Sequence, residues 1–226
     1  PELGWDWGVH IMPYIEQSNI YDQIDFSTTD HYALGPPFSG GALATNGNRD
    51  PLGTVVPIYL CPSDPHPVDK FDPSSVLVIT VAITNYVGVV DSRNAYKEAG
   101  TDITYEGNGM FFNRSAVRID DVYDGTSNTL LIGEGTGATP EPWHFNWMGG
   151  SLVHAGFGIN GHCSALNGNT WCDAGYPPGA GFSSWHPGGA NFAYVDGRVR
   201  LSPETIDQTT LEALATRARR EVVGSQ

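Results

Sequence analysis

The sequence predicts an α+β domain with a central antiparallel β-sheet, long loops and a short C-terminal helix. Runs rich in aromatic and β-branched residues at 191–195 and 198–201 flank Asp196-Gly197, a pattern typical of a β-hairpin. Further β-branched runs lie at 76–90, and apolar spacing indicates an amphipathic helix at 209–218. The 28 glycines and 16 prolines among 226 residues indicate that much of the remainder is turn and loop.

Composition predicts a single domain over residues 1–226, with loop insertions at about 27–57, 91–109 and 135–184. The formal charge of −14, with only 11 Lys and Arg, argues against nucleic acid and against anionic membrane surfaces as partners. Divalent cations are the more natural partners of such a chain. The N-terminus lacks a signal-peptide pattern and no run approaches the length of a membrane span, so we expect a processed chain.

The first elements are expected to be short. Apolar residues at Ile11, Tyr14 and Ile15 predict a short helix, in which Pro13 is tolerated only in the first turn. Trp5 and Trp7 are interpreted as lids on the core, with an aromatic sugar platform as the alternative. Residues 55–60 predict a short strand that ends at Cys61.

The middle of the chain is predicted to alternate strands with turns. One or two strands are expected over 76–90. Ile119 and Val122 suit one helical turn, and residues 129–132 predict a buried strand that leads to Glu134. The triplet 113–115 (Asn-Arg-Ser) satisfies the N-glycosylation pattern, so glycans remain an open alternative.

The hairpin carries the most specific local expectations. Asp-Gly predicts a type I′ turn, and Phe192, Tyr194, Val199 and Leu201 are the candidates for its buried face. His186 is placed at the mouth of the hairpin, where donation to a backbone carbonyl is favoured over a metal or catalytic role. The C-terminal helix is expected to dock on this hairpin through one apolar face.

Oxygen donors gather in the middle of the chain, without the spacing of an EF-hand loop: Asp120, Asp124, Asn128 and Glu134. Capping and turn formation are the favoured explanation of their spacing. The acidic excess nevertheless predicts a bound divalent cation, calcium, in one of these turns, because crowded carboxylates repel unless a hard cation neutralises them.

Cysteine spacing predicts a Cys163–Cys172 disulfide, since the polar segment between them has no apolar reason to stay ordered. A disulfide implies an oxidising, extracytoplasmic setting, and Cys61 is left over as a free thiol. Ser184, His186 and Asp196 form the only set that mimics a hydrolase triad. The chain lacks a GxSxG elbow, and we expect no enzymatic activity.

Six sequence blocks carry a family resemblance: Trp5-Asp6-Trp7-Gly8 with Pro13-Tyr14-Ile15-Glu16-Gln17, Cys61-Pro62-Ser63-Asp64, Thr84-Asn85-Tyr86-Val87-Gly88, residues 124–129 (DGTSNT), Ile132-Gly133-Glu134 and residues 186–197 (HPGGANFAYVDG). Together they resemble a large family of unknown function that is abundant in planctomycete bacteria. Members of that family are similar to type IV pilins and type II secretion pseudopilins, and the family has also been labelled as extracellular solute-binding.

The resemblance implies a pilin-like head whose hydrophobic N-terminal helix precedes residue 1. It also implies an upstream cysteine as the partner of Cys61 in the full-length protein. By analogy with calcium-binding pseudopilins, Asp196 joins Asp120–Glu134 as a candidate ligand. The last block supplies a structural motif that comprises His186, Gly188, Gly189, Asn191, Asp196 and Gly197.

The leading functional hypothesis is therefore a structural subunit of an extracellular pilin-like filament or secretion pseudopilus. Its expected partners are copies of itself or other pilin-like subunits, and it would contact the membrane only through the preceding helix. An extracytoplasmic module that binds carbohydrate or another solute is the alternative, motivated by 6 Trp and 10 Tyr interspersed with polar residues.

Overall fold

The computed structural model describes residues 5–27, 49–65, 70–71, 81–92, 107–112, 115–136, 145–146, 152–160 and 181–219. Cys163, Cys172 and Asn113 lie outside these residues, as do most of the three expected loop insertions. The described part of 135–184 contains short ordered elements: β5 (Phe145–Asn146), β6 (Leu152–Val153) and the 3₁₀ helix η5 (Ala155–Phe157).

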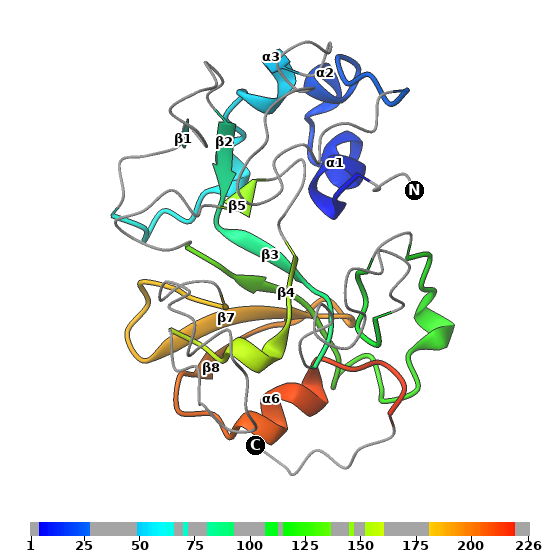
Figure 1. Cartoon of the computed structure of the whole chain (residues 1–226), viewed down its shortest axis with the longest axis vertical. Coiled ribbons are helices and arrows are strands. Elements are labelled where there is room, and N and C mark those ends of the chain that lie inside the picture. The colour runs from blue at the N-terminus through cyan, green and yellow to red at the C-terminus, as the bar shows by residue number, and fades with distance from the viewer. Residues whose placement is uncertain are drawn as a thin grey trace, which may run out of the picture.

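A five-stranded sheet forms the lower half of the molecule (Figure 1). Its strand order is β6-β3-β4-β7-β8, built from β3 (Tyr86–Val89), β4 (Leu130–Glu134), β7 (Gly189–Tyr194) and β8 (Val199–Pro203) together with β6. The four strands from β3 to β8 pair antiparallel, and β6 runs parallel to β3 at one edge. The predicted α+β fold with a central antiparallel sheet is confirmed.

The β7–β8 hairpin is confirmed, but its predicted turn type is wrong. Gly197 has a φ of 86°, and Asp196 does not share that positive φ, so a type I′ turn is excluded. Instead the Gly197 amide donates to the Tyr194 carbonyl, and the Tyr194 amide donates to the Arg198 carbonyl. This pattern is a tight turn followed by a glycine bulge. The Asp196 carboxylate accepts from the Arg198 amide at 3.1 Å.

This turn shifts the hairpin register by one residue and changes which side chains are buried. Ala193 pairs with Val199 and Asn191 pairs with Leu201, so Val199 and Leu201 lie on the face opposite Phe192. Phe192 and Tyr194 are buried as predicted. Val199 and Leu201 are 65% and 52% exposed, so their predicted burial is wrong.

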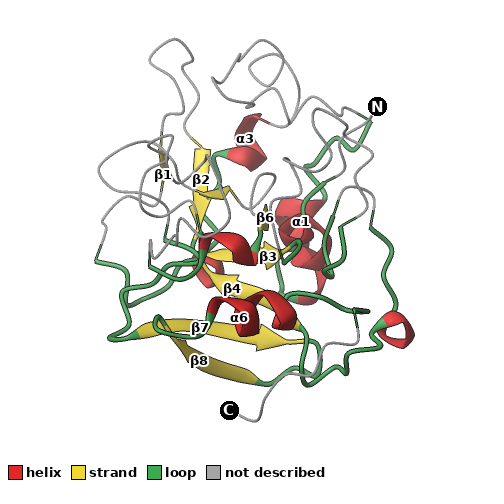
Figure 2. Cartoon of the chain, turned by 60° about the horizontal axis from the view of Figure 1, so that its bottom comes forward, coloured by secondary structure: helices red, strands yellow, loops and turns green. Residues whose placement is uncertain are grey.

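Helix α6 (Gln208–Leu214) covers the buried face of the sheet, as Figure 2 shows. It begins after Asp207, whose carboxylate accepts from the Thr210 amide as an N-cap. Its Leu211 and Leu214 pack into what we call the sheet cluster, which confirms the predicted docking. The buried members of the sheet cluster are Val87, Val89, Leu130, Val153, Ala155, Ile159, Phe182, Ala190, Phe192, Tyr194, Leu211, Leu214 and Ala215.

The upper half consists of short helices and a small sheet (Figure 1). Its elements are α1 (Trp7–Ile11), η1 (Met12–Tyr14), α2 (Ser18–Tyr21), α3 (Arg49–Leu52), η3 (Pro57–Tyr59), β1 (Lys70–Phe71), β2 (Val81–Thr84) and β5, with sheet order β1-β2-β5. They enclose what we call the N-terminal cluster: Trp7, Val9, Met12, Ile20, Ile24, Leu52, Val56, Tyr59, Ala82 and Ile83.

Two local expectations fall in this half. The predicted helix near Ile11 exists as the α1 and η1 pieces, with Pro13 at the start of η1. The strand predicted at 55–60 is wrong, because Pro57 begins the 3₁₀ helix η3 instead. Tyr59 then turns inward and its hydroxyl donates to the Gly8 carbonyl at 2.5 Å.

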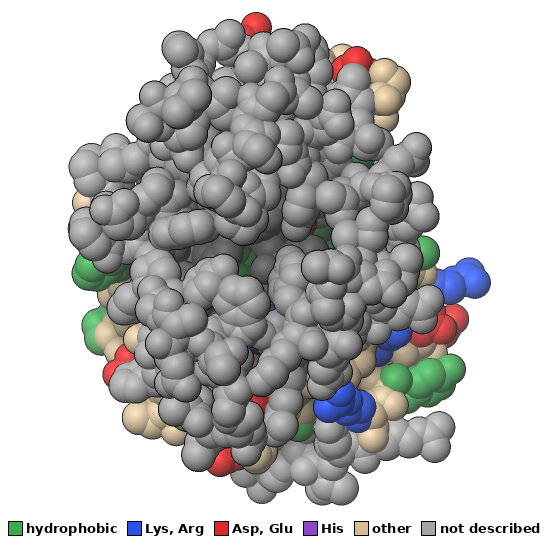
Figure 3. Space-filling model, viewed as in Figure 1, with side chains coloured by type: hydrophobic (Ala, Val, Ile, Leu, Met, Phe, Trp, Pro, Cys, Tyr) green, Lys and Arg blue, Asp and Glu red, His purple; other side chains and the backbone are tan. Residues whose placement is uncertain are grey.

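The outer surface of the described residues mixes side-chain types. At the margin of one face, acidic and hydrophobic side chains are seen on both sides and basic ones at the right and lower right, with a small recessed area of histidine near the centre (Figure 3). The predicted helical turn near Ile119 is present as η4 (Ile119–Asp121), and Ile119 itself is 66% exposed. Among the residues described, no helix has both the length and the apolar character needed to cross a membrane.

Candidate functional site

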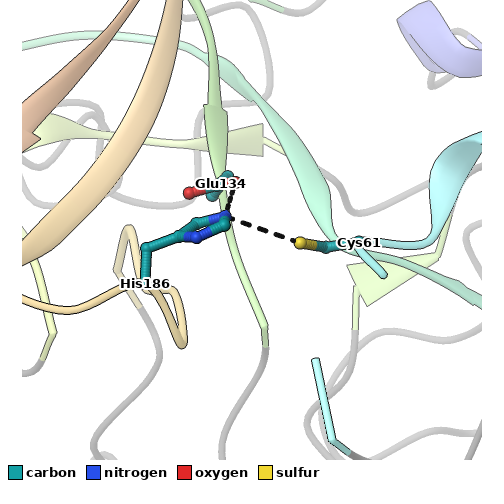
Figure 4. A group of neighbouring side chains, drawn as sticks. All are labelled: Cys61, Glu134 and His186. Atoms are coloured by element: carbon teal, nitrogen blue, oxygen red, sulfur yellow. Dashed lines mark hydrogen bonds and ion pairs between the residues drawn. The ribbon is translucent and has the colours of Figure 1, made fainter. Parts of the chain in front are cut away.

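Cys61, Glu134 and His186 come together between the two halves of the molecule (Figure 4). Cys61 follows η3, Glu134 ends β4, and His186 precedes β7. The His186 Nε2 atom lies 3.1 Å from Glu134 Oε1 and 3.8 Å from Cys61 Sγ. Within the described residues, this is the only group of three or more His, Cys, Asp or Glu whose ligand atoms converge, all within 4.8 Å of one another.

Cys61 is held in place through its backbone by Asn85. The Asn85 side-chain oxygen accepts from the Cys61 amide at 2.8 Å, and its side-chain nitrogen donates to Asp64 Oδ2 at 2.8 Å. The Asn85 amide donates to the Tyr59 carbonyl, so a single buried residue ties the segment after η3 to the junction of β2 and β3. Cys61 carries a free thiol.

Glu134 is positioned by the packing of β4 on β7. A Cβ at Gly133 would lie 2.6 Å from Phe182 and 2.7 Å from Phe192, so only glycine lets this strand lie against the two rings. The Glu134 carboxylate accepts from the Asn191 amide at 2.7 Å and from the Asn191 side chain at 3.1 Å. Both hydrogen bonds aim the nearly buried carboxylate at His186.

His186 is positioned by a turn that its own segment forms. The Ser184 hydroxyl donates to the Gly189 carbonyl at 2.8 Å and accepts from the His186 amide at 3.0 Å. Gly188 adopts a φ of 81°, which favours glycine, and returns the chain into β7. A backbone carbonyl as the partner of the His186 side chain stays a prediction, and the contacts that the structure gives for Nε2 are with a carboxylate and a thiol.

The site is polar but largely shielded from water. The Glu134 side chain is 5% exposed and the His186 side chain is 29% exposed. Tyr86, half-buried in β3, lies beside them. Burial raises the pKa of the Tyr86 phenol most, and negative charge on Cys61 and then on Glu134 raises it further. Tyr86 therefore keeps its proton and lines the site as a hydrogen-bonding group.

The other predicted metal ligands are placed elsewhere. Asp124 accepts from Thr216 and from the Arg219 amide, and the Asn128 side chain donates to the Asp124 carbonyl. Asp120 lies in η4, and Asp196 lies in the β7–β8 turn beside Arg198. Of the predicted set, Glu134 alone reaches a converging group of ligand atoms among the described residues, and the calcium site stays a prediction.

The set that mimics a hydrolase triad is also separated. Ser184 bonds within the turn before β7, whereas Asp196 lies beyond the other end of that strand. The Cys163–Cys172 disulfide lies outside the described residues. Sequence reasoning missed the contact of Cys61 with His186, although the three residues of the site lie in three of the six blocks that carry the family resemblance.

A family model described as "Protein of unknown function (DUF1559)", with the short name SBP_bac_10, matches residues 1–209. No curated protein matches the chain, and neither does any solved structure. The match extends over every block that carries the resemblance, from Trp5 to Gly197.

Proposed function

The chain belongs to the DUF1559 family, and from this premise we propose that it is the globular head of a structural subunit in an extracellular pilin-like filament or secretion pseudopilus. The antiparallel sheet with a C-terminal helix on one face suits such a head. The solute-binding label in the short name of the family is compatible with an extracytoplasmic location.

The observation that carries this proposal is an apolar strip on the outer face of the edge strand β8. The register of the hairpin places Val199 and Leu201 on that face, where they are 65% and 52% exposed. Ala193 lies beside Val199 across the hairpin and is half-buried. Neighbouring apolar side chains on one sheet face offer area for a subunit contact, whereas single exposed apolar residues need no explanation.

Charge supports an apolar contact of this kind. Heads that carry a formal charge of −14 repel one another, so cohesion between copies requires burial of uncharged surface. We assign the β8 strip to contact with a second copy of the chain. The hydrophobic helix that the family resemblance implies ahead of residue 1 would supply the remaining cohesion and the membrane contact. This function requires no catalytic residue.

The test is to image material from cells that produce the full-length protein with Val199→Asp and Leu201→Asp together. We expect wild-type protein to form filaments with helical symmetry in electron micrographs, and the double variant to remain dispersed. Ile58→Asp with Ile119→Asp is the matched control, since both residues are exposed but lie far from β8 in the sequence. Wild-type protein that never forms an ordered polymer would contradict the proposal.

The alternative function, a binding module for carbohydrate or another solute, rests on Trp185. This side chain is 49% exposed and directly precedes His186 at the mouth of the hairpin. An exposed indole face stacks on sugar rings. Calorimetry with a set of oligosaccharides, compared between the native chain and Trp185→Ala, distinguishes this function from filament formation.

A further inference from the structure

We propose that Cys61, Glu134 and His186 bind one zinc ion. With zinc bonds of about 2.3 Å to sulfur and about 2.0–2.2 Å to nitrogen and oxygen, ligand atoms of a tetrahedral site lie roughly 3.3–3.6 Å apart. The separations of 3.8 Å from Nε2 to Sγ and 3.1 Å from Nε2 to Oε1 bracket this range. All of the ligand atoms lie within 4.8 Å of one another, so they surround a common point.

The geometry distinguishes a metal site from a nucleophilic relay. In a relay, one nitrogen of the imidazole faces the nucleophile and the other faces the carboxylate. Here the thiol and the carboxylate both approach Nε2 (Figure 4). A ring nitrogen that faces a thiol sulfur and a carboxylate oxygen at once is arranged to share a metal ion with them.

The donor set selects the metal. A thiolate and an imidazole are poor ligands for calcium or magnesium, which take oxygen, whereas zinc accepts sulfur, nitrogen and carboxylate oxygen together. A zinc ion here is therefore different from the calcium predicted among the oxygen donors. Three protein ligands leave a fourth position for water, and the 29% exposure of the His186 side chain leaves the site open on that side.

The surroundings hold the ligands as outer-shell groups do in metal sites. Asn191 fixes the Glu134 carboxylate through two hydrogen bonds, Asn85 fixes the backbone of Cys61, and Ser184 fixes the backbone of His186. Because Cys61 comes from the upper half, whereas Glu134 ends β4 and His186 lies in the turn before β7, zinc would cross-link the two halves. This inference is independent of filament formation.

The first test uses the unaltered chain, purified under reducing conditions and stripped of metal with a chelator. Alkylation of Cys61 by iodoacetamide is followed by mass spectrometry, peptide by peptide. We expect equimolar zinc chloride to slow this alkylation at least about tenfold, because a coordinated thiolate is shielded. Calcium chloride should leave the rate unchanged, and a chelator should restore it.

The second test replaces the ligands singly by Cys61→Ser, Glu134→Gln and His186→Gln. Cobalt(II), added as a spectroscopic substitute for zinc, should give a thiolate-to-cobalt charge-transfer absorption in the native chain at a ratio of one ion per chain. We expect Cys61→Ser to abolish this absorption, and the other two variants to weaken cobalt binding at least about tenfold. His10→Gln is the matched control, an exposed histidine that lies in α1.

Three results would overturn the proposal. One is an alkylation rate of Cys61 in the native chain that zinc does not change, a measurement that does not depend on how any variant folds. Another is a cobalt absorption that persists in Cys61→Ser, which would place the ion on other cysteines. The third is a Cys61 disulfide to an upstream cysteine in the full-length protein isolated from its cells.

Discussion

The two halves of the molecule are stabilised in different ways. The lower half is a regular sheet, in which hydrogen-bonded ladders connect β3, β4, β7 and β8 and α6 covers one face. The upper half packs helices of 3–5 residues around the N-terminal cluster, and specific bonds such as Tyr59 to the Gly8 carbonyl connect them. Isolated helices of this length are unstable in water, so their order depends on packing.

The difference shows why the polar site lies where it does. Among the described residues, no strand of the five-stranded sheet pairs with the segment after η3. Within these residues the backbone connects the two only at Asn85, which lies between β2 and β3 and donates to the Tyr59 carbonyl. Side chains make that connection instead, through Asn85 and through the contact of Cys61 with His186. The proposed zinc ion would therefore add a further side-chain connection between the two halves.

The largest expected effect is in the sheet cluster. Phe192 is fully buried and its ring packs edge-to-face on Phe182 at 4.8 Å between centroids. Phe192→Ala should lower the free energy of unfolding by about 3–5 kcal/mol, because it removes buried apolar area and leaves a cavity. Denaturant unfolding followed by circular dichroism measures the change.

A matching substitution in the upper half tests whether the two halves are stabilised separately. Met12 is fully buried in the N-terminal cluster, and Met12→Ala should cost about 2–5 kcal/mol by the same mechanism. We expect Phe192→Ala to lower hydrogen-exchange protection in both halves, and Met12→Ala to lower it chiefly in α1 and α2. Equal loss of protection everywhere in both variants would show that the halves are one unit.

Prediction from the sequence succeeded where a pattern has local causes. The hairpin, the strand before Glu134 and the docking of α6 depend on short apolar runs and on turn or cap residues, and all three are confirmed. The burial of Val199 and Leu201 failed because a bulge at Gly197 shifts the register, and a one-residue shift exchanges the faces of a strand.

The candidate site was less accessible to sequence reasoning for a related reason. Cys61, Glu134 and His186 are far apart in the chain and lie in segments of different structure, so no spacing rule connects them. Only the paths of β4 and β7 and the Asn85 bridge bring them together. The sequence predicts Glu134 as an oxygen ligand of calcium, whereas in the structure its carboxylate lies beside the His186 nitrogen and the Cys61 sulfur.

The next expected effect is a loss of stability at low pH, caused by a buried histidine in the lower half. His154 is 3% exposed, and burial lowers its pKa to about 4, although negative charge on the buried Asp91 opposes the shift. The unfolded chain takes up this proton near pH 6.5, and the folded chain does not until about pH 4. Stability should therefore be fully present above pH 6.5 and should fall by on the order of 3 kcal/mol by pH 4.

Denaturant midpoints measured between pH 7 and pH 4 check this dependence. His154→Gln should remove the part of the pH dependence of the midpoint that His154 contributes. His10 is an exposed histidine in α1, so His10→Gln should leave the pH dependence unchanged. Carboxylates titrate in the same range, so the comparison is between variants at each pH. Identical slopes for the native chain and His154→Gln would contradict the assigned pKa.

The smallest of these effects tests the connection between the halves. Asn85→Ala, in metal-free buffer, removes the acceptor of the Cys61 amide and the donor to Asp64, both at a residue that is 2% exposed. The loss of these two hydrogen bonds should cost about 1–3 kcal/mol in the free energy of unfolding. Asn128→Ala is the matched control, because its exposed side chain donates to a turn carbonyl at 3.3 Å. Its loss should change stability by about 0.5 kcal/mol or less. Since Asn85 joins the segment after η3 to the sheet, its loss should lower exchange protection in α1 and η3 while β4 and β7 keep theirs. If protection in β4 and β7 falls equally, the two halves are coupled by their apolar packing, for example by Ile132 against the N-terminal cluster, and the side-chain bridge is a minor contributor.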